Sequence, residues 1–493
     1  MLDRSLAFGA VLVSGAILVA FIAPACSKDE ASVEPAPATD AAAYVYRGQG
    51  CDYDVPMPER FAFQDVRPDD PESEGAAPLR VRLGLGGRVT MGEAGYADAS
   101  RSAALTWQTK EPSGASRVRF GQSPDTLTET RAGFAWTTAP PESGLGSTEP
   151  ETYMHEVHVC GLEPGRTYYY QVGGGAPEVW SATQSFTTVP QEGKVTVGIM
   201  GDSRDDVGVW QLIQMRLKEK AVNLQMTTGD LVYIGTQQSL YDKWLGAIWK
   251  DPNDATRFLT LGQQMMLMVA GNHELEAARF FGAFALPGEG EYAESYASLN
   301  VLNTHFVLLD DQPIAMPQEP EQKKTMLDWL EADLTRAEAN RATVPFIVVL
   351  HHRGLFTTSN HATDSDVLDA RKALVPIYDK HKVDLVLNGH DHAFEKTKPL
   401  VAGADPRGEP TVVGAGQGRL YVVNAGAGAG GYAVGAHPAA YSEKALAYGS
   451  GTPYSGLYSV ATLEGRKFTL ESYGLASSAS ATDTVIDTVE LTR

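Results

Sequence analysis

The sequence predicts a multidomain fold in which an antiparallel β-sandwich is followed by an α/β domain of layered β-sheets flanked by helices. Residues 79–189 form short segments in which polar and apolar residues alternate, with glycine and proline between them, a pattern typical of antiparallel strands. After Pro190, continuous apolar runs alternate with stretches of helical spacing, which indicates buried strands and helices in layers. A chain of 493 residues also exceeds what one hydrophobic core usually organises.

The composition predicts a globular protein with an acidic surface. Hydrophobic residues make up 43% of the chain, and 40 Lys and Arg against 61 Asp and Glu give a formal net charge of -21. A broad basic surface for nucleic acid is therefore not expected. An anionic substrate must instead be attracted locally, which metal ions can do.

Residues 1–25 are predicted to be a signal peptide. The uncharged run from Leu6 to Ala23 is long for a signal-peptide core and borderline for a membrane span. The segment from Ala23 to Cys26 resembles a bacterial lipoprotein signal, in which Cys26 is lipidated and attaches the protein to a membrane, and it also fits ordinary cleavage after Ala25. Both interpretations predict an exported protein, either a membrane-anchored lipoprotein of the periplasm or cell surface or a secreted protein. A retained transmembrane anchor is the third alternative.

Residues 26–77 are predicted to be a lipoprotein-like tether and an acidic arm. The stretch from Ser27 to Ala43 has almost nothing to bury, whereas residues 44–77 carry aromatic side chains that can pack along a neighbouring domain. Besides Cys26, the chain has only Cys51 and Cys160. In an oxidising compartment we expect these two to form a disulfide that ties the arm to the sandwich. The alternative, two unpaired core residues, is disfavoured by the polar surroundings of Cys51.

Residues 78–190 are predicted to form the sandwich. Strands are expected at Leu79–Leu83, Ala104–Thr109, Arg117–Phe120 and His155–Val159. The stretch 161–172, followed by 185–188, resembles the closing strands of a fibronectin type III domain. His155 and His158 alternate with apolar residues, so we expect them at the surface and not as metal ligands.

Residues 191–493 are predicted to form the α/β domain with C-terminal β-strands. Helices are expected at about 209–220, 240–249, 319–340 and 367–381, the third with an apolar face at Met326, Trp329, Leu330 and Leu334. Strands are expected at 195–200, 223–228, 265–270, 306–309, 345–350, 383–387 and 420–424. The tail alternates again and is expected to add edge strands. The glycine-rich run 426–431 is predicted to be a close-packed loop near the site described next.

Short polar motifs follow the apolar runs of this domain. They are Gly201-Asp202-Ser203-Arg204, Gly229-Asp230-Leu231-Val232-Tyr233, Gly271-Asn272-His273-Glu274, Val348-Val349-Leu350-His351 and Gly389-His390-Asp391-His392. Ligand sites of open α/β sheets lie beyond the carboxyl ends of strands, so these motifs are expected to converge. The glycines suit a backbone that must turn sharply off a strand. His352 is ambiguous, because its side chain faces away from that of His351 if the strand persists.

The side chains of these motifs offer carboxylate, phenolate, amide and imidazole ligands without thiolates. This set suits iron, zinc or manganese. It is larger than one ion needs, and it suits two ions about 3.5 to 4 Å apart that share a bridging ligand.

The set resembles the calcineurin-like metallophosphoesterase superfamily, and Tyr233 makes it most similar to purple acid phosphatases. The resemblance covers most of residues 195–435 and extends to the fibronectin-like domain, which in that family precedes the catalytic one. It assigns one ion, ferric in the family, to Asp202, Tyr233 and His392, a second ion, iron, zinc or manganese, to Asn272, His351 and His390, and the bridging position to Asp230.

The resemblance also implies residues that act on the substrate. His273 matches the family histidine that contacts phosphate, and His361 falls where the family places a histidine acting on the substrate or leaving group. Position 204 departs from the family, which usually has glycine where this chain has Arg204 followed by two aspartates. A guanidinium there can clamp a phosphate oxygen or pair with the neighbouring acids, and both interpretations stand.

The resemblance implies an exported acid phosphatase-like enzyme that cleaves phosphate monoesters, in a small molecule or a protein, by in-line attack of a metal-bound hydroxide. One alternative is a phosphodiesterase or nucleotidase with the same metal centre. Another is a surface binding module with a vestigial metal site, which the complete ligand set disfavours.

Overall fold

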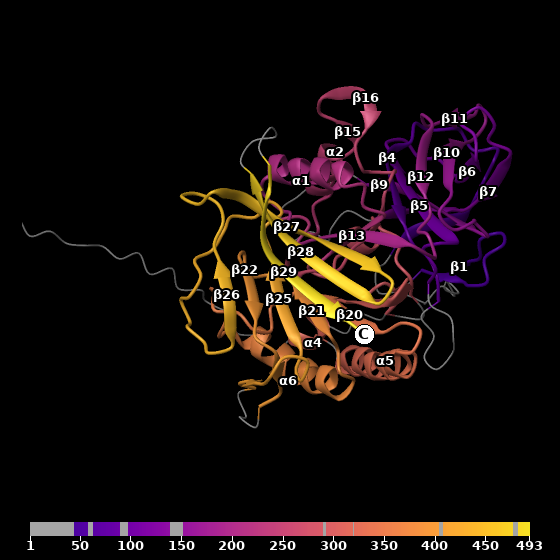
Figure 1. Cartoon of the computed structure of the whole chain (residues 1–493). Helices are drawn as coiled ribbons and strands as arrows, with labels where there is room; N and C mark the ends of the chain where they lie inside the picture. The colour runs from indigo at the N-terminus through magenta and orange to yellow at the C-terminus, as the bar shows by residue number, and fades with distance from the viewer. Residues whose placement is uncertain are drawn as a thin grey trace, which may run out of the picture. The chain divides into compact units, whose positions relative to one another are not determined.

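Two mixed β-sheets lie face to face in the C-terminal part of the protein, with helices on their outer faces (Figure 1). This computed structural model describes residues 44–57, 63–88, 97–138, 151–288, 292–318, 320–403, 408–476 and 482–493. The predicted signal peptide, Cys26 and the predicted tether up to residue 43 lie outside the described residues. Within the described ranges, no helix combines the length and apolar character needed to cross a membrane.

The first sheet has eleven described strands and runs through both predicted domains. Their order is β29 (Thr484–Thr492), β28 (Lys467–Ala476), β27 (Tyr454–Glu464), β13 (Lys194–Met200), β14 (Leu224–Thr227), β17 (Met265–Leu267), β4 (Leu79–Gly84), β5 (Ser102–Thr109), β9 (Thr152–Cys160), β8 (Phe134–Thr138) and β3 (Gln64–Pro68). β17 pairs with β4 in parallel, which joins the sandwich to the α/β layers. The C-terminal strands extend the opposite edge, as expected from their alternation.

The second sheet has seven described strands. Their order is β18 (Tyr296–Val301), β19 (Thr304–Leu309), β20 (Phe346–His351), β21 (Leu385–Asn388), β25 (Leu420–Asn424), β22 (Phe394–Thr397) and β26 (Ser442–Leu446). β19, β20, β21 and β25 run parallel, as do β13, β14 and β17 of the first sheet. Because parallel strands end at the same edge, the loops after them meet there.

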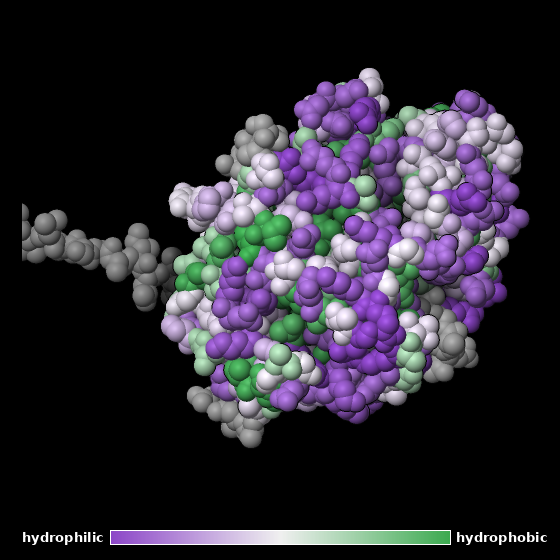
Figure 2. All heavy atoms as spheres, viewed as in Figure 1, coloured by the Kyte–Doolittle hydropathy of each residue, from purple (hydrophilic) through white to green (hydrophobic). Residues whose placement is uncertain are grey.

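The core lies between the sheets and beneath the helices. Val197 and Ile199 of β13 belong to the core shared with the second sheet, while the neighbouring Met200 packs in a cluster with α1 (Val207–Glu219) and α2 (Gln238–Ala247). On the other side α5 (Pro320–Ala339) and α6 (Ser365–Lys380) cover the second sheet (Figure 1). The predicted apolar face of α5 is confirmed, because its four residues are buried. Figure 2 shows hydrophilic residues over the outer side of α5.

The N-terminal part is the predicted antiparallel sandwich. The strands β4, β5, β9, β8 and β3 face a smaller sheet of β6 (Arg117–Gly121), β7 (Glu129–Ala132), β10 (Thr167–Gly174), β11 (Val179–Trp180) and β12 (Gln184–Thr187). The boundaries at residues 78 and 191 stay predictions.

The expectation that two histidines of β9 lie at the surface was wrong, because both faces of this strand are covered. His155 is buried in the sandwich, where its ring stacks on Trp107 at 5.0 Å and is hydrogen-bonded to Ser116 at 3.0 Å. His158, on the other face, is buried under the N-terminal arm. His155 shares its face of the strand with Val157 and Val159 of the core, so alternation itself places it inside, whereas alternation cannot reveal that the arm covers the face of His158.

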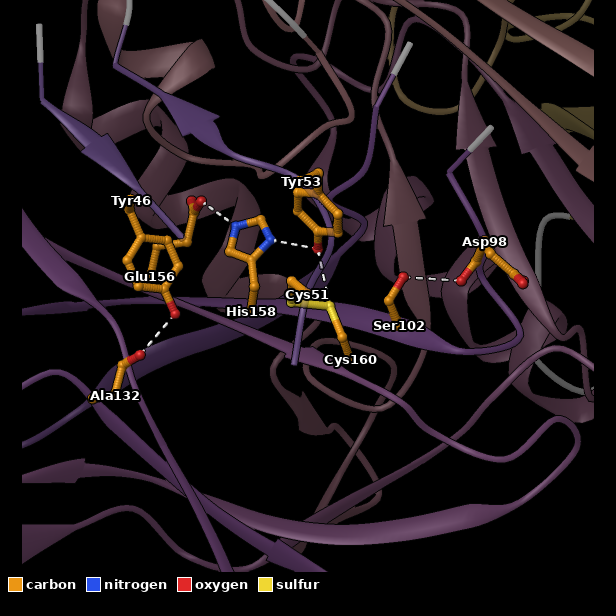
Figure 3. The surroundings of a disulfide bond; sticks show 9 residues. All are labelled: Tyr46, Cys51, Tyr53, Asp98, Ser102, Ala132, Glu156, His158 and Cys160. Atoms are coloured by element: carbon orange, nitrogen blue, oxygen red, sulfur yellow. Dashed lines mark hydrogen bonds and ion pairs between the residues drawn. A yellow bond between two sulfur atoms is a disulfide. The ribbon is translucent and has the colours of Figure 1, made fainter. Parts of the chain in front are cut away.

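The expected disulfide between Cys51 and Cys160 is confirmed. Figure 3 shows the side chains that pack around it. The Tyr53 hydroxyl lies 3.5 Å from the Sγ of Cys160 and is hydrogen-bonded to Nδ1 of His158 at 2.9 Å. The other ring nitrogen of His158 contacts the Glu156 carboxylate at 2.7 Å. The bridge and this chain of polar contacts hold the arm on β9.

Candidate metal centre

Three of the predicted ligands sit at strand ends in a backbone conformation that few side chains adopt. The φ angles of Asp202, Asp230 and His390 are 57°, 58° and 71°. Such left-handed residues cost about 1–3 kcal/mol each, and they concentrate at functional sites. The strained residues are thus the ligands themselves, whereas among the four motif glycines we expected to turn the chain only Gly229 has a positive φ, of 97°.

The other motif glycines are required for space. A Cβ on Gly201 would lie 2.1 Å from the Thr228 hydroxyl, one on Gly271 would lie 2.3 Å from Oδ1 of Asp230, and one on Gly389 would lie 2.4 Å from Oδ2 of Asp202. Contacts this short exclude any side chain without movement of the loop. The glycines therefore let neighbouring loops approach closely enough for their polar side chains to meet.

A first donor set consists of Asn272, His352, His390 and one oxygen of Asp230. Oδ1 of Asn272 lies 3.0 Å from Nε2 of His352 and 2.9 Å from Nδ1 of His390, and these two nitrogens are 3.2 Å apart. Nδ1 of His352 donates to the carbonyl of Thr228 at 2.7 Å, so Nε2 faces the other donors. Converging lone pairs repel unless a proton or a cation lies among them, so this set favours a cation.

A second donor set consists of Asp202, His392 and the other oxygen of Asp230. Nε2 of His392 lies 3.4 Å from Oδ1 of Asp202, and its Nδ1 donates to the carbonyl of Gly430 at 2.7 Å. The ring of His392 stacks on Tyr432 at 4.0 Å. The predicted close-packed glycine-rich loop is confirmed here, because Ala429 donates from its backbone to the Asp202 carbonyl at 2.8 Å.

Asp230 connects the two sets. Its Oδ1 lies 3.2 Å from Nε2 of His352, and its Oδ2 lies 3.4 Å from Nε of Arg204, which in turn contacts His392. The carboxylate is 1% exposed. A buried carboxylate whose oxygens face different donor groups has the geometry of a bridging ligand.

The structure places His352, and not His351, in the first set. Nδ1 of His351 faces Asp311 at 2.9 Å, and its ring contacts Asn388 on the far side of the strand from Asp230. The expectation that His351 joins the other ligands is therefore corrected. β20 ends at His351, and the next residue points to the opposite side, as the alternation of a strand requires.

The predicted substrate residues surround these donors. His273 lies beside Asp230, with Nε2 3.8 Å from Oδ2, and Nδ1 of its ring contacts the Tyr233 carbonyl at 2.7 Å. The ring of His361 lies 4.2 Å from that of His390, and its Nδ1 is bonded to Asp364 at 2.7 Å. Arg204 pairs with Asp205 at 3.1 Å, as one of the two interpretations expects, and its contact with a phosphate oxygen stays a prediction.

Tyr233 is the least engaged of the predicted ligands. Its side chain is 54% exposed, beside the ring of His273 and 5.4 Å from the guanidinium carbon of Arg204. Its hydroxyl makes no hydrogen bond to another described residue. Its role as a ligand stays a prediction.

The charges of the site favour bound cations. Burial opposes ionisation of Asp230, but the charge and hydrogen bond of His352, followed by His273, lower its pKa. Burial likewise opposes protonation of His352, but Asp230 outweighs it and raises the pKa of His352 to about 10. Burial, and then His352, lower the pKa of His390 well below its usual range. A buried histidine held protonated by carboxylates marks a position where positive charge is stabilised.

The donor set fits metal ions. Atoms of Asp202, Asp230 and His352 lie within 4.8 Å of one another, and all three residues are buried. Oxygen and imidazole donors without thiolates suit iron, zinc or manganese. The described residues can therefore hold a metal ion beside Asp230.

Comparisons with known protein families match both parts of the chain. Residues 93–188 match the family model described as purple acid phosphatase, N-terminal domain, and residues 197–394 match that of calcineurin-like phosphoesterase. All the residues of the two donor sets fall in the second match, which confirms the expected family resemblance.

Relatives and solved structures agree. The chain is 29% identical to purple acid phosphatase 21 of Arabidopsis thaliana over 67% of this chain and 69% of that protein, and 28% identical to purple acid phosphatase 22 of the same plant over 52% and 56%. The second match thus spans little more than half of that relative. The structure of purple acid phosphatase PPD1 from yellow lupin superposes with a TM-score of 0.61 at 18% identity, covering 85% of this chain and 75% of that one. This likeness confirms the fold.

Proposed function

Because this chain is a purple acid phosphatase-like member of the calcineurin-like metallophosphoesterases, we propose that it is a metal-dependent phosphatase that hydrolyses phosphate monoesters at a dinuclear centre. The observation that carries the proposal is the position of Asp230, whose Oδ1 faces His352 and whose Oδ2 faces Arg204 beside His392. We propose that Asn272, His352 and His390 hold one ion, that Asp202 and His392 hold the other with Tyr233, and that Asp230 bridges them.

Bound ions would supply the Lewis acid that activates water and neutralises the phosphoryl oxygens. The chain supplies the rest of the site. His273 stands at the rim of the Asp230 carboxylate with one ring nitrogen tied to the Tyr233 carbonyl, so its Nε2 is free to contact a phosphate oxygen. Arg204 adds a fixed positive charge on the same side.

His361 is the proposed proton donor to the leaving group. Its Nδ1 is bonded to Asp364, which fixes the ring and leaves Nε2 for the substrate. Its side chain is 28% exposed and its ring lies beside that of His390, so it borders the proposed metal centre and also reaches solvent. A leaving alkoxide needs such a proton, because the alkoxide is a strong base.

Export is part of the proposal. The disulfide between Cys51 and Cys160 supports an oxidising compartment. Attachment through a lipidated Cys26 is the form we propose, and mass spectrometry of the mature N-terminus tests it. A lipid mass on Cys26 is expected, and an unmodified N-terminus would leave secretion.

The decisive experiment measures turnover of p-nitrophenyl phosphate and bis-p-nitrophenyl phosphate by full-length protein, stripped with chelator and reloaded with iron, zinc or manganese. We expect metal-dependent turnover of the monoester and a loss of at least about 100-fold in Asp230→Asn, because both ions lose the shared charge. Asp254→Asn, at an exposed hairpin position, is the matched control. Turnover of the diester alone would favour the phosphodiesterase alternative. Bound metal without turnover of either ester would favour the binding module.

A further inference from the structure

Arg204 contacts His392 and Asp230 of the second donor set, and of the first set it contacts the shared Asp230. Its Nη2 lies 3.2 Å from Nε2 of His392 and its Nε lies 3.4 Å from Oδ2 of Asp230. The residue is only 8% exposed. Among the residues that the structure describes, no lysine or arginine is hydrogen-bonded or ion-paired to Asn272, His352 or His390. Arg204 therefore places beside His392, in the second half, a positive charge that cannot be lost as a proton.

The contact with His392 has a defined direction. A guanidinium only donates, so Nε2 of His392 must accept the hydrogen bond from Arg204. The other ring nitrogen carries its hydrogen toward the carbonyl of Gly430. Arg204 thus uses the lone pair that an ion in this half would need.

We propose that Arg204 is an internal cation that competes with the metal ion for the Asp202 and His392 half of the centre, so that the two ions load in sequence. This inference rests on the proposed metal centre. The half with Asn272, His352 and His390 fills first. The second ion binds more weakly, because it must displace the guanidinium from Asp230 and His392.

Two groups can receive the displaced guanidinium. Asp205 is already 3.1 Å from Nη1 of Arg204, and its side chain is 40% exposed. The exposed ring of Tyr233 lies 5.4 Å from the guanidinium carbon, within range of a cation–π contact. The backbone N–H of Arg204 donates to the Asp230 carbonyl at 3.2 Å, and this bond can persist while the side chain rotates. Displacement requires only side-chain rotation, and it leaves the positive charge at the rim where a phosphate would arrive.

The test is a Mn²⁺ titration of metal-free, full-length protein, in which electron paramagnetic resonance measures free Mn²⁺ and the signal of coupled pairs. The wild type is expected to bind two ions, the second at least about 10-fold more weakly than the first. Arg204→Met is expected to tighten the second step by about 10-fold or more and to leave the first step unchanged. Arg204→Lys keeps the positive charge, so its affinity for the second ion is expected to stay close to that of the wild type.

Arg119→Met is the matched control, because Arg119 lies in the sandwich, where it contacts Gln171 and Trp180 and none of the proposed metal ligands among the described residues. If Arg204→Met does not fold, Asp205→Asn replaces it, and the second step is then expected to weaken by about 5-fold while the first holds. The competition would be overturned if Arg204→Met bound the second Mn²⁺ ion with the wild-type affinity or more weakly. It would also be overturned if Asp205→Asn bound the second ion with the wild-type affinity. Failure of every variant and the wild type to bind Mn²⁺ would instead overturn the metal centre itself.

Discussion

The carboxylate of Glu274 accepts a hydrogen bond of 2.9 Å from the backbone N–H of Asp230. The same oxygen accepts from Gly271 at 2.6 Å, and the other accepts from Leu231 at 2.8 Å. One buried side chain thus joins the loop that presents Asp230 to the loop that presents Asn272. Burial, and then the charge of Asp230, raise the pKa of Glu274 to about 8. Glu274 therefore positions the bridging residue through the backbone of its loop.

Replacing Glu274 with glutamine should destabilise the protein. The amide nitrogen cannot accept hydrogen bonds, so buried N–H groups of these loops lose their partner at about 1–3 kcal/mol each. Urea unfolding of the metal-free protein above pH 8, where the Glu274 carboxylate is ionised, measures the free energy of unfolding. Glu490→Gln is the control, because that carboxylate pairs with Lys467 at the surface, where its side chain is 56% exposed, and its loss is expected to cost less than about 1 kcal/mol. Equal unfolding midpoints for the two variants would contradict the positioning role.

His351 and His352 should have opposite phenotypes. His352→Ala removes a donor of the first set, so metal analysis of purified, reloaded protein is expected to find at least one ion fewer than in the wild type. His351→Ala leaves the donors intact but opens a space beside Asp311 and Asn388, so it is expected to lower the free energy of unfolding by about 2–4 kcal/mol and to retain metal. Loss of metal in His351→Ala with full occupancy in His352→Ala would restore the original assignment.

This pair also shows what the sequence could predict of the site. The motifs were expected at strand ends because apolar runs precede them, and Asp202, Asp230, Asn272, His390 and His392 do converge. The choice between adjacent histidines depends on which face of β20 is turned toward the loops of the other sheet. That orientation is fixed by the packing of two sheets, which residues 346–352 do not encode by themselves.

Burial of the histidines in β9 illustrates the same limit within the fold. The alternating pattern correctly predicted a strand, but a second sheet covers His155 and the arm covers His158. The arm that covers His158 comes from a segment distant in sequence, so the pattern of β9 cannot reveal it. The disulfide was predictable because the predicted export and the count of cysteines leave a single pair.

His155 should make the protein sensitive to acid. Burial, followed by the charge of Arg67, lowers the pKa of His155 to about 3, whereas a histidine in the unfolded chain titrates near 6.5. At a pH between these two values, His155 is therefore protonated in the unfolded state and neutral in the folded state. The stability contributed by His155 is complete above about pH 6.5 and is lost as the pH falls toward 3, by up to about 1.4 kcal/mol per pH unit.

Unfolding free energies of wild type and His155→Phe between pH 7 and 4 test this prediction. Phenylalanine keeps the stacking on Trp107 but gives up the bond to Ser116, so the variant should be less stable at pH 7 and should lose less stability on acidification. His437→Gln, at an exposed position, is the control for loss of a histidine. Parallel curves for wild type and His155→Phe would show that another group governs the acid response.

Gly389→Ala should damage the metal centre while sparing the fold. Gly389 has an ordinary φ, so alanine meets no backbone strain there, but its Cβ would lie 2.4 Å from Oδ2 of Asp202 and 3.0 Å from the Thr228 hydroxyl. The carboxylate of Asp202 must then move away from His392. We expect metal affinity in the Asp202 and His392 half of the centre to fall by about 10-fold or more, with a smaller change in unfolding free energy.

Gly246→Ala is the matched control, because Gly246 is exposed in α2 and an added Cβ would meet no described atom within 4 Å outside its own helix backbone and its chain neighbours. Alanine should stabilise that helix by about 0.5–1 kcal/mol and leave metal binding unchanged. A Gly389→Ala protein with the metal affinity of Gly246→Ala would show that the close approach of the 389 loop does not position Asp202.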